Sequence, residues 1–142
     1  MQLARSSSRK VLVVEDEPAV LQLIVTRLAI AGYTTFQARD GQEAVRRLRE
    51  VAPAAMLLDI NMPLVDGFEV LSQMHRNGQT KSVAVMVLTA RNQPQDVRRA
   101  IALGARDFLA KPFRDEQLLA RVARLVRRPS PLQGSSDQLD AD

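Results

Sequence analysis

The stretch from Lys10 to Pro18 reads KVLVVEDEP, and it decides the fold. Four aliphatic residues in a row, Val11 to Val14, indicate a strand that is buried on both faces, as in a parallel sheet covered by helices. Charge follows at once in Glu15-Asp16-Glu17, and Pro18 stands where the first turn of a helix tolerates proline. The stretch therefore predicts a strand that passes directly into a helix, with an acidic turn between them.

The same alternation continues along the chain. We expect further strands at 33–38, 54–58, 83–88 and 107–110, because each range is a short apolar run. We expect helices at 18–32, 40–51, 67–76, 94–104 and 115–128, where apolar residues recur at helical spacing between glycine and proline breaks. Asp40 begins a capping box with Glu43, and Asp66-Gly67 is typical of a turn and helix cap. Five strand–helix alternations predict an α/β domain with a parallel sheet.

The two ends differ from this core in composition. Residues 1–8 and 129–142 are polar, are rich in serine, proline or aspartate, and have no periodicity. We expect a flexible leader at 1–8 and a flexible polar tail at 129–142. Residues 9–128 then form the one domain of the 142-residue chain.

Composition argues against several classes of protein. The chain has no cysteine, which excludes thiolate chemistry. It has one histidine, His75, which disfavours a histidine-based metal site or a Ser-His-Asp hydrolase. The longest run of aliphatic residues and methionine, Val83 to Leu88, has six residues, whereas a membrane-spanning helix needs about 20. Residues 1–10 lack the apolar segment of a secretory signal. We expect a cytoplasmic protein that does not enter the membrane.

The charge is moderately positive, with 20 basic and 16 acidic residues. The arginines are spread over several segments, and aromatic residues make up only 4% of the chain, so no stacking platform for bases is evident. We therefore do not expect this chain alone to bind nucleic acid.

Reactive groups follow four of the five expected strands: Glu15-Asp16-Glu17, Asp59, Thr89 and Lys111. In an open α/β sheet, ligands bind at the carboxyl ends of the strands, so these groups should converge on one rim. Clustered carboxylates repel one another unless a cation holds them, and carboxylate oxygens suit Mg²⁺, Mn²⁺ or Ca²⁺. A hydroxyl and an ammonium group suit the oxygens of a phosphoryl group. The set predicts phosphoryl transfer to a carboxylate nucleophile with a divalent metal.

Four motifs carry a resemblance to a known family, namely 11–18, 59–67, 87–90 and 104–113. In order and spacing they resemble the receiver domain of two-component response regulators, and they are most similar to the OmpR/PhoB-like receiver pattern. The resemblance covers about residues 9–128. It implies a flavodoxin-like (βα)5 three-layer sandwich with a parallel five-stranded sheet in the order 2-1-3-4-5.

By this resemblance, Asp59 is the phosphoacceptor and attacks the phosphorus of a phosphohistidine on a sensor histidine kinase or a histidine phosphotransfer protein. Mg²⁺, for which Mn²⁺ can substitute, would be bound directly by Asp16 and mostly through water by Glu15. Asp59 and the backbone carbonyl of Asn61 would complete its protein ligands. The chain uses lysine at only three positions, so Lys111 at a strand end suggests a need for a compact ammonium group.

The resemblance also implies a switch. Thr89 would move to bond the phosphoryl oxygen, Lys111 would pair with its charge, and Ala90 leaves room for it. Phe108 matches a rotameric aromatic residue that turns inward when Thr89 moves. Arg91 would shield the phosphoryl group and slow its loss. The peptide bond before Pro112 matches a position that is usually cis.

The expected output surface runs from Pro94 to Arg128. It would contact a downstream protein or form a phosphorylation-dependent homodimer in which Asp107 pairs with Arg121 of a second copy. Arg106 departs from the subfamily, which often has an acidic residue there. On the last helix, a solvated basic face is the simpler interpretation of its arginines.

Several alternatives stay open. We expect a stand-alone receiver that is not an enzyme and only slowly loses its phosphoryl group, but the chain could be the receiver half of a truncated DNA-binding regulator. A haloacid-dehalogenase-like phosphatase needs an acid two residues after the nucleophile, where this chain has Asn61. A flavodoxin needs a hydroxyl- and glycine-rich phosphate loop where this chain has Glu15-Asp16-Glu17. A degenerate receiver would lack one of the reactive positions, which are all filled.

Overall fold

We analysed a computed structural model, which describes residues 9–91 and 93–127. The expected flexible leader at 1–8, the expected tail at 129–142 and Arg128 lie outside the described residues.

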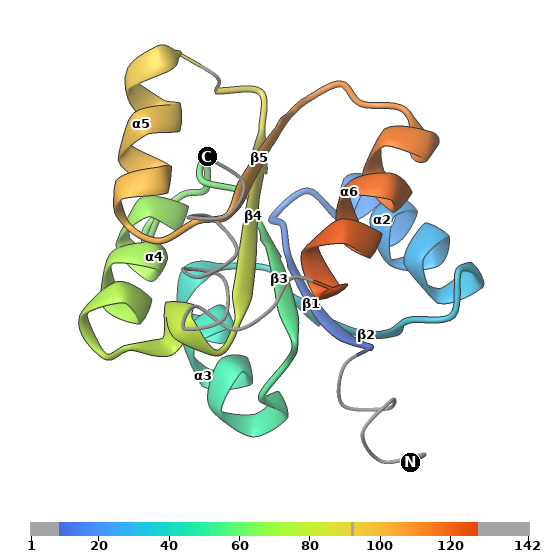
Figure 1. The fold of residues 1–142 in the computed structure, drawn as a ribbon, viewed down its shortest axis with the longest axis horizontal. Coiled ribbons are helices and arrows are strands. Elements are labelled where there is room, and N and C mark those ends of the chain that lie inside the picture. Colours follow the sequence, from blue (N-terminus) through green and yellow to red (C-terminus); the bar gives the residue numbers. More distant parts are fainter. Residues whose placement is uncertain (1–8, 92, 128–142) are drawn as a thin grey trace, which may run out of the picture.

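Five parallel strands form one sheet in the order β2-β1-β3-β4-β5 (Figure 1). The strands are β1 Lys10–Val14, β2 Thr34–Ala38, β3 Ala55–Leu58, β4 Ala84–Thr89 and β5 Asp107–Ala110. This confirms the predicted fold class and strand order. The strand β2 is added on one side of β1 and the strand β3 on the other, so the strand order changes direction between β1 and β3. Such sheets bind their ligands at this point.

Five helices cover the two faces of the sheet: α2 Pro18–Ile30, α3 Gly41–Val51, α4 Gly67–Arg76, α5 Pro94–Ala102 and α6 Asp115–Arg127. In Figure 1, α3, α4 and α5 lie on one face, and α2 and α6 lie on the other. A short 3-10 helix, η1 Gln79–Lys81, was not predicted. It follows Gly78, whose positive φ of 78° turns the chain after α4, and three residues are too few to show a period.

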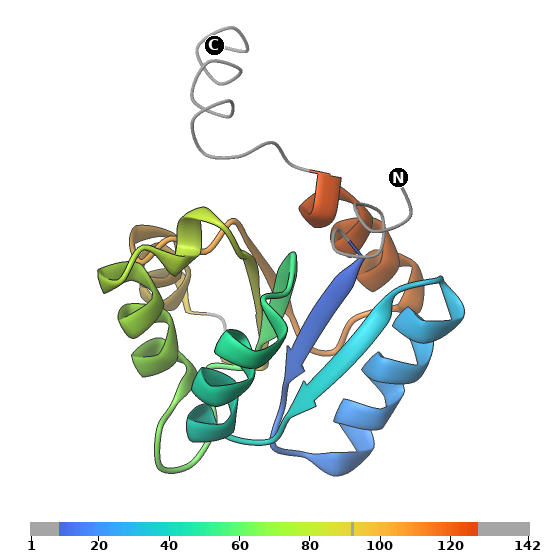
Figure 2. The same cartoon turned by 90° about the horizontal axis from the view of Figure 1, so that it is seen from below.

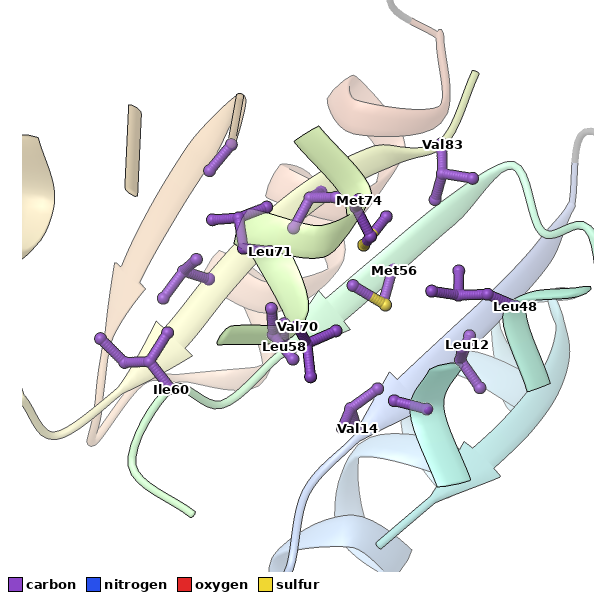
Figure 3. Packing of buried hydrophobic residues seen from close by; sticks show 14 of the residues in the cluster. Leu12, Val14, Leu48, Met56, Leu58, Ile60, Val70, Leu71, Met74 and Val83 are labelled. Carbon is purple, nitrogen blue, oxygen red and sulfur yellow. The ribbon is translucent and has the colours of Figure 1, made fainter. Parts of the chain in front are cut away.

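Alternate residues of each strand pack on opposite faces, as a period of two requires. Leu12 and Val14 of β1 pack with the cluster under α3, α4 and α5, which Figure 3 shows from close by. Val11 and Val13 pack with the cluster under α2 and α6. The sheet therefore has two apolar layers, and the polar groups of the inner strands β1, β3 and β4 lie at the strand ends.

Two N-cap residues and one glycine fix the starts of α3 and α4 next to the sheet rim. Asp40 accepts a hydrogen bond from the Glu43 amide at 2.8 Å, and Asp66 accepts one from the Glu69 amide at 3.0 Å. These are the predicted N-caps. A Cβ at Gly67 would lie 2.5 Å from the carbonyl oxygen of Asp59, so only glycine lets α4 begin this close to the loop after β3.

The two ends of the described chain lie on the side of the sheet where the strands begin, away from the strand carboxyl ends (Figure 2). The Ala54 amide bonds the carbonyl of Lys10 at the start of β1, and a surface hollow joins Ala54 to Leu125 and Val126 near the end of α6. Within the part of the chain that the structure describes, no helix has both the length and the apolar character needed to cross a bilayer.

Candidate functional site

The carboxyl ends of four strands bring the expected reactive groups to one rim. Asp59 follows β3, and its amide bonds the carbonyl of Val14 at the end of β1. Lys111 follows β5, and its amide bonds the carbonyl of Thr89 at the end of β4. Because these backbone bonds tie neighbouring strand ends together, groups far apart in sequence become neighbours in space.

Lys111 joins the two buried acids of this rim. Its ammonium nitrogen lies 2.7 Å from Oε1 of Glu15 and 3.3 Å from Oδ2 of Asp59. Glu15 is 1% exposed and Asp59 is 4% exposed. Charged groups at such depth are found only when they are paired, and here one cation serves two carboxylates.

Burial shapes the acid–base properties of this pair. Burial raises the pKa of Glu15 above its ordinary value, and the neighbouring Asp59 charge adds to the rise, although the hydrogen bond from Lys111 opposes it. Burial alone would lower the pKa of Lys111, but the hydrogen bond to Glu15 and the charges of Asp59 and Glu15 outweigh it and raise that pKa. Lys111 is therefore held as a cation at neutral pH.

Three carboxylates of the rim could hold a metal ion. Glu15, Asp16 and Asp59 each offer an oxygen, and these oxygens all lie within 4.8 Å of one another. Asp16 is more exposed than the other two. Three carboxylates facing a single ammonium group leave excess negative charge, which suits a divalent cation with oxygen ligands.

The hollow around Asp59 also contains the hydroxyl and the small residue expected there. Its lining consists of Glu15, Asp16, Glu17, Pro18, Asp59, Asn61, Thr89, Ala90 and Lys111. The Asn61 amide donates to Oδ1 of Asp59 at 2.9 Å and so orients the carboxylate. Thr89 is buried, and its hydroxyl oxygen accepts a hydrogen bond from the Arg91 amide at 3.2 Å.

Two expected site residues do not line this hollow. Phe108 is partly buried and packs against the core cluster under α3, α4 and α5. The Arg91 side chain lies beside Asp96, with Nε 3.2 Å from Oδ1, and over the ring of Phe68. Sequence reasoning missed Asp96 and Phe68, because an acid in a first helical turn and an apolar residue on a helix have ordinary structural explanations.

The region expected to pair across a dimer makes an ion cluster within one chain. Asp107 accepts hydrogen bonds from Arg121 at 2.8 Å and from Arg124 at 3.3 Å, both on α6 of the same chain. The pairing between two copies stays a prediction. The peptide bond between Lys111 and Pro112 is cis, as the resemblance implied.

Comparison with known proteins gives a consistent result. The family model described as "Response regulator receiver domain" matches residues 11–123. The DNA-binding dual master transcriptional regulator RpaA of Synechocystis sp. PCC 6803 is 39% identical over 84% of this chain and 49% of its own length. The phosphate regulon transcriptional regulatory protein PhoB of Escherichia coli K12 is 34% identical over 88% of this chain and 55% of its own length.

The chain thus spans about half the length of the curated relatives that it matches. Among solved structures, the chemotaxis protein CheY4 of Vibrio cholerae matches with a TM-score of 0.77 and 33% identity, over 82% of this chain and 97% of that one. The similarity to PhoB agrees with the OmpR/PhoB-like pattern expected from the motifs.

Proposed function

This chain belongs to the response regulator receiver domain family, and from that premise we propose that it is a phosphorylation-controlled switch whose phosphoacceptor is Asp59. Membership implies a two-component system with a cognate histidine kinase. The donor in our proposal is a phosphohistidine on that kinase or on a histidine phosphotransfer protein.

One observation carries the proposal: a single ammonium group, that of Lys111, contacts both Glu15 and Asp59, while Asp16 offers a third carboxylate oxygen nearby. An oxygen of Asp59 attacks phosphorus, the bond from phosphorus to the histidine nitrogen breaks, and the imidazole leaves with the electron pair. Lys111 pairs with the charge that builds on the phosphoryl oxygens. A carboxylate nucleophile has no proton to lose, so the attack needs no general base.

The chain's own oxygen ligands fit Mg²⁺ or Mn²⁺. Asp16 and Asp59 would bind the ion directly, Glu15 mostly through water, and Asn61 through its backbone carbonyl. When bound, the ion offsets the negative charge shared by the carboxylates and the phosphoryl group. Asn61 cannot protonate a leaving group, which favours a slowly resetting acceptor over a phosphatase.

The switch runs from Thr89 to the surface at 94–127. Thr89 moves toward the phosphoryl oxygen, Phe108 turns inward, Ala90 leaves space, and the equilibrium between two surfaces of α5, β5 and α6 shifts. Arg91 shields the phosphoryl group and slows reset. Reset is hydrolysis: water attacks phosphorus, inorganic phosphate leaves, and Asp59 regains its carboxylate.

The output is a protein contact in the cytoplasm through the 94–127 surface, either to a downstream partner or to a second copy. One candidate is a receiver that acts directly through such a contact. The second candidate is the receiver half of a DNA-binding regulator, which the similarity to RpaA and PhoB over about half their length favours.

The test is intact-mass measurement after incubation with acetyl phosphate and Mg²⁺. Wild type should gain the mass of one phosphoryl group, and D59N should gain none. D66N is the matched control, because Asp66 lies on the same loop but caps α4, and asparagine also caps helices. A wild type that gains no mass, or a D59N that gains as much as wild type, would refute the proposal.

A further inference from the structure

Asp96 is a buried carboxylate that none of the roles above uses. It lies in the first turn of α5 and is 4% exposed. Its Oδ1 accepts a hydrogen bond from Nε of Arg91 at 3.2 Å. A buried carboxylate without a cation is costly, so the folded protein favours keeping Arg91 next to Asp96.

The Arg91 side chain is held on a second side by an aromatic ring. Its guanidinium carbon lies 5.4 Å from the centre of the Phe68 ring, and the guanidinium carbon of Arg99 lies 4.2 Å from the same ring. Phe68 is buried at the start of α4. Attraction of a cation to a ring face adds to the ion pair. Together they keep Arg91 between α4 and α5, outside the hollow that contains Asp59.

The backbone of the same residue touches the proposed switch. The Arg91 amide donates to the Thr89 hydroxyl oxygen, and Thr89 lines the hollow with Asp59. A phosphoryl group on Asp59 would add a charge of about −2 to this hollow. The phosphoryl group and Asp96 would then compete for one guanidinium group.

We propose that Asp96 is a positioning residue that holds Arg91 away from phosphorylated Asp59 and thereby sets how long the aspartyl phosphate lasts. The proposal rests on the proposed function. When Arg91 stays with Asp96, water reaches phosphorus and the bond from phosphorus to the Asp59 oxygen breaks. The products are inorganic phosphate, the free carboxylate and one proton released to solvent. When Arg91 is released, it covers the phosphoryl group and slows this attack.

The test follows the decay of the phosphorylated full-length chain. Protein is phosphorylated with acetyl phosphate and Mg²⁺, the donor is removed, and the phosphorylated fraction is followed by intact mass. D96N should lose its phosphoryl group about fivefold more slowly than wild type, since one partly screened ion pair shifts an equilibrium by about that factor. R91A should lose it faster than wild type. The double variant should decay as R91A does, because Asp96 acts only through Arg91.

Glu50 provides the matched control. It pairs with Arg47 at 3.4 Å near the end of α3, at the opposite end of that helix from the sheet rim. E50Q removes an exposed arginine–carboxylate pair that lies away from the rim and should decay at the wild-type rate. D96E restores the charge and should return the decay toward wild type, which a merely structural effect of D96N would not predict.

The proposal is overturned if D96N decays as fast as wild type or faster, or if D96N slows decay equally when Arg91 is already alanine. If D96N does not fold, D96S, which keeps a small polar group in the same space, carries the same expectations. Failure of the proposed function looks different, because wild type would then gain no phosphoryl mass at all.

Discussion

Glu15 is a residue whose protonation couples directly to folding, because it is buried next to Asp59 and Lys111. Its pKa is raised in the folded chain above its ordinary value of 4.5, so between that value and the raised pKa the folded state binds more protons than the unfolded state. The contribution of Glu15 to the free energy of unfolding must therefore fall as the pH rises through this window.

We predict that this fall is missing in E15Q. The measurement is urea unfolding in EDTA at a series of pH values from about 4.5 to 8 for both proteins. The advantage of wild type over E15Q should shrink with rising pH, since ionisation of Glu15 occurs at a burial cost that glutamine does not have. A difference that is constant, or that grows with pH, would contradict the raised pKa.

Leu64 is held in a backbone conformation that suits other residues better. Its φ is 67°, in the left-handed region, and it is 95% exposed, so no burial compensates for the strain. Leu64→Asn should raise the free energy of unfolding by about 1 kcal/mol, because asparagine tolerates this region. Leu64→Ala, which keeps the strained Cβ, is the control in the same urea titration. A less stable L64N would show that Leu64 makes an unrecognised contact.

Sequence reasoning predicted the residues at the strand ends better than it predicted the side chains around them. Asp59, Thr89 and Lys111 could be brought together because each ends a strand, and strand ends meet in a parallel sheet. The position of Arg91 could not be predicted in this way. A long side chain in a loop is placed by whichever partners it finds, and here these are Asp96 and Phe68, which come from two different helices.

Helix α4 begins in close contact with the loop that follows β3 and contains Asp59. A Cβ at Gly67 would meet the carbonyl oxygen of Asp59 and the Cα of Ile60, both at 2.5 Å, and neither backbone atom can rotate away. Gly67→Ala should lower the free energy of unfolding by about 1–3 kcal/mol and slow phosphorylation by acetyl phosphate, because the loop must shift. Ser72→Ala, which removes a half-buried hydroxyl that accepts a hydrogen bond from Arg76 on the same helix, should change both far less. A G67A protein with wild-type stability would contradict the close approach.

Apolar runs and helix-breaking residues predict most of the helices and strands, but the residues at which they begin and end depend on contacts across the fold. The second strand begins at Thr34 and not at Tyr33, because the Tyr33 amide still bonds the carbonyl of Leu28 at the end of α2. Helix α5 ends at Ala102, before the expected Gly104. The short helix η1 has no periodic signal, so only the structure reveals it.

For the whole molecule, the acid cluster should make stability depend on magnesium. A ligand that binds only the folded state at ten times its Kd raises the free energy of unfolding by about 1.4 kcal/mol. Urea unfolding of wild type should therefore shift to higher urea as Mg²⁺ replaces EDTA at constant ionic strength. D16N should lose most of this shift, because Asp16 is one of the three clustered carboxylates. An equal shift in both proteins would mean that the ion acts elsewhere.

The order of the strands was the part of the architecture least accessible from pattern alone. Alternating strands and helices predict a parallel sheet, but several orders satisfy that pattern, and the resemblance selected 2-1-3-4-5. In the structure, β1 pairs with both β2 and β3, which is the order that the resemblance implied. Because β1 lies next to β3, the acidic turn after β1 faces Asp59 at the end of β3.

The start of β1 and the end of α6 lie where the strands begin, which is the side of the sheet remote from Asp59 (Figure 2). A surface tether, a fluorescent fusion or an affinity tag placed next to Arg9 or Arg127 would therefore lie on the side of the sheet that is remote from Asp59. Protein immobilised through that side would keep the hollow around Asp59 open to solvent, which makes real-time binding assays on an unaltered rim practicable.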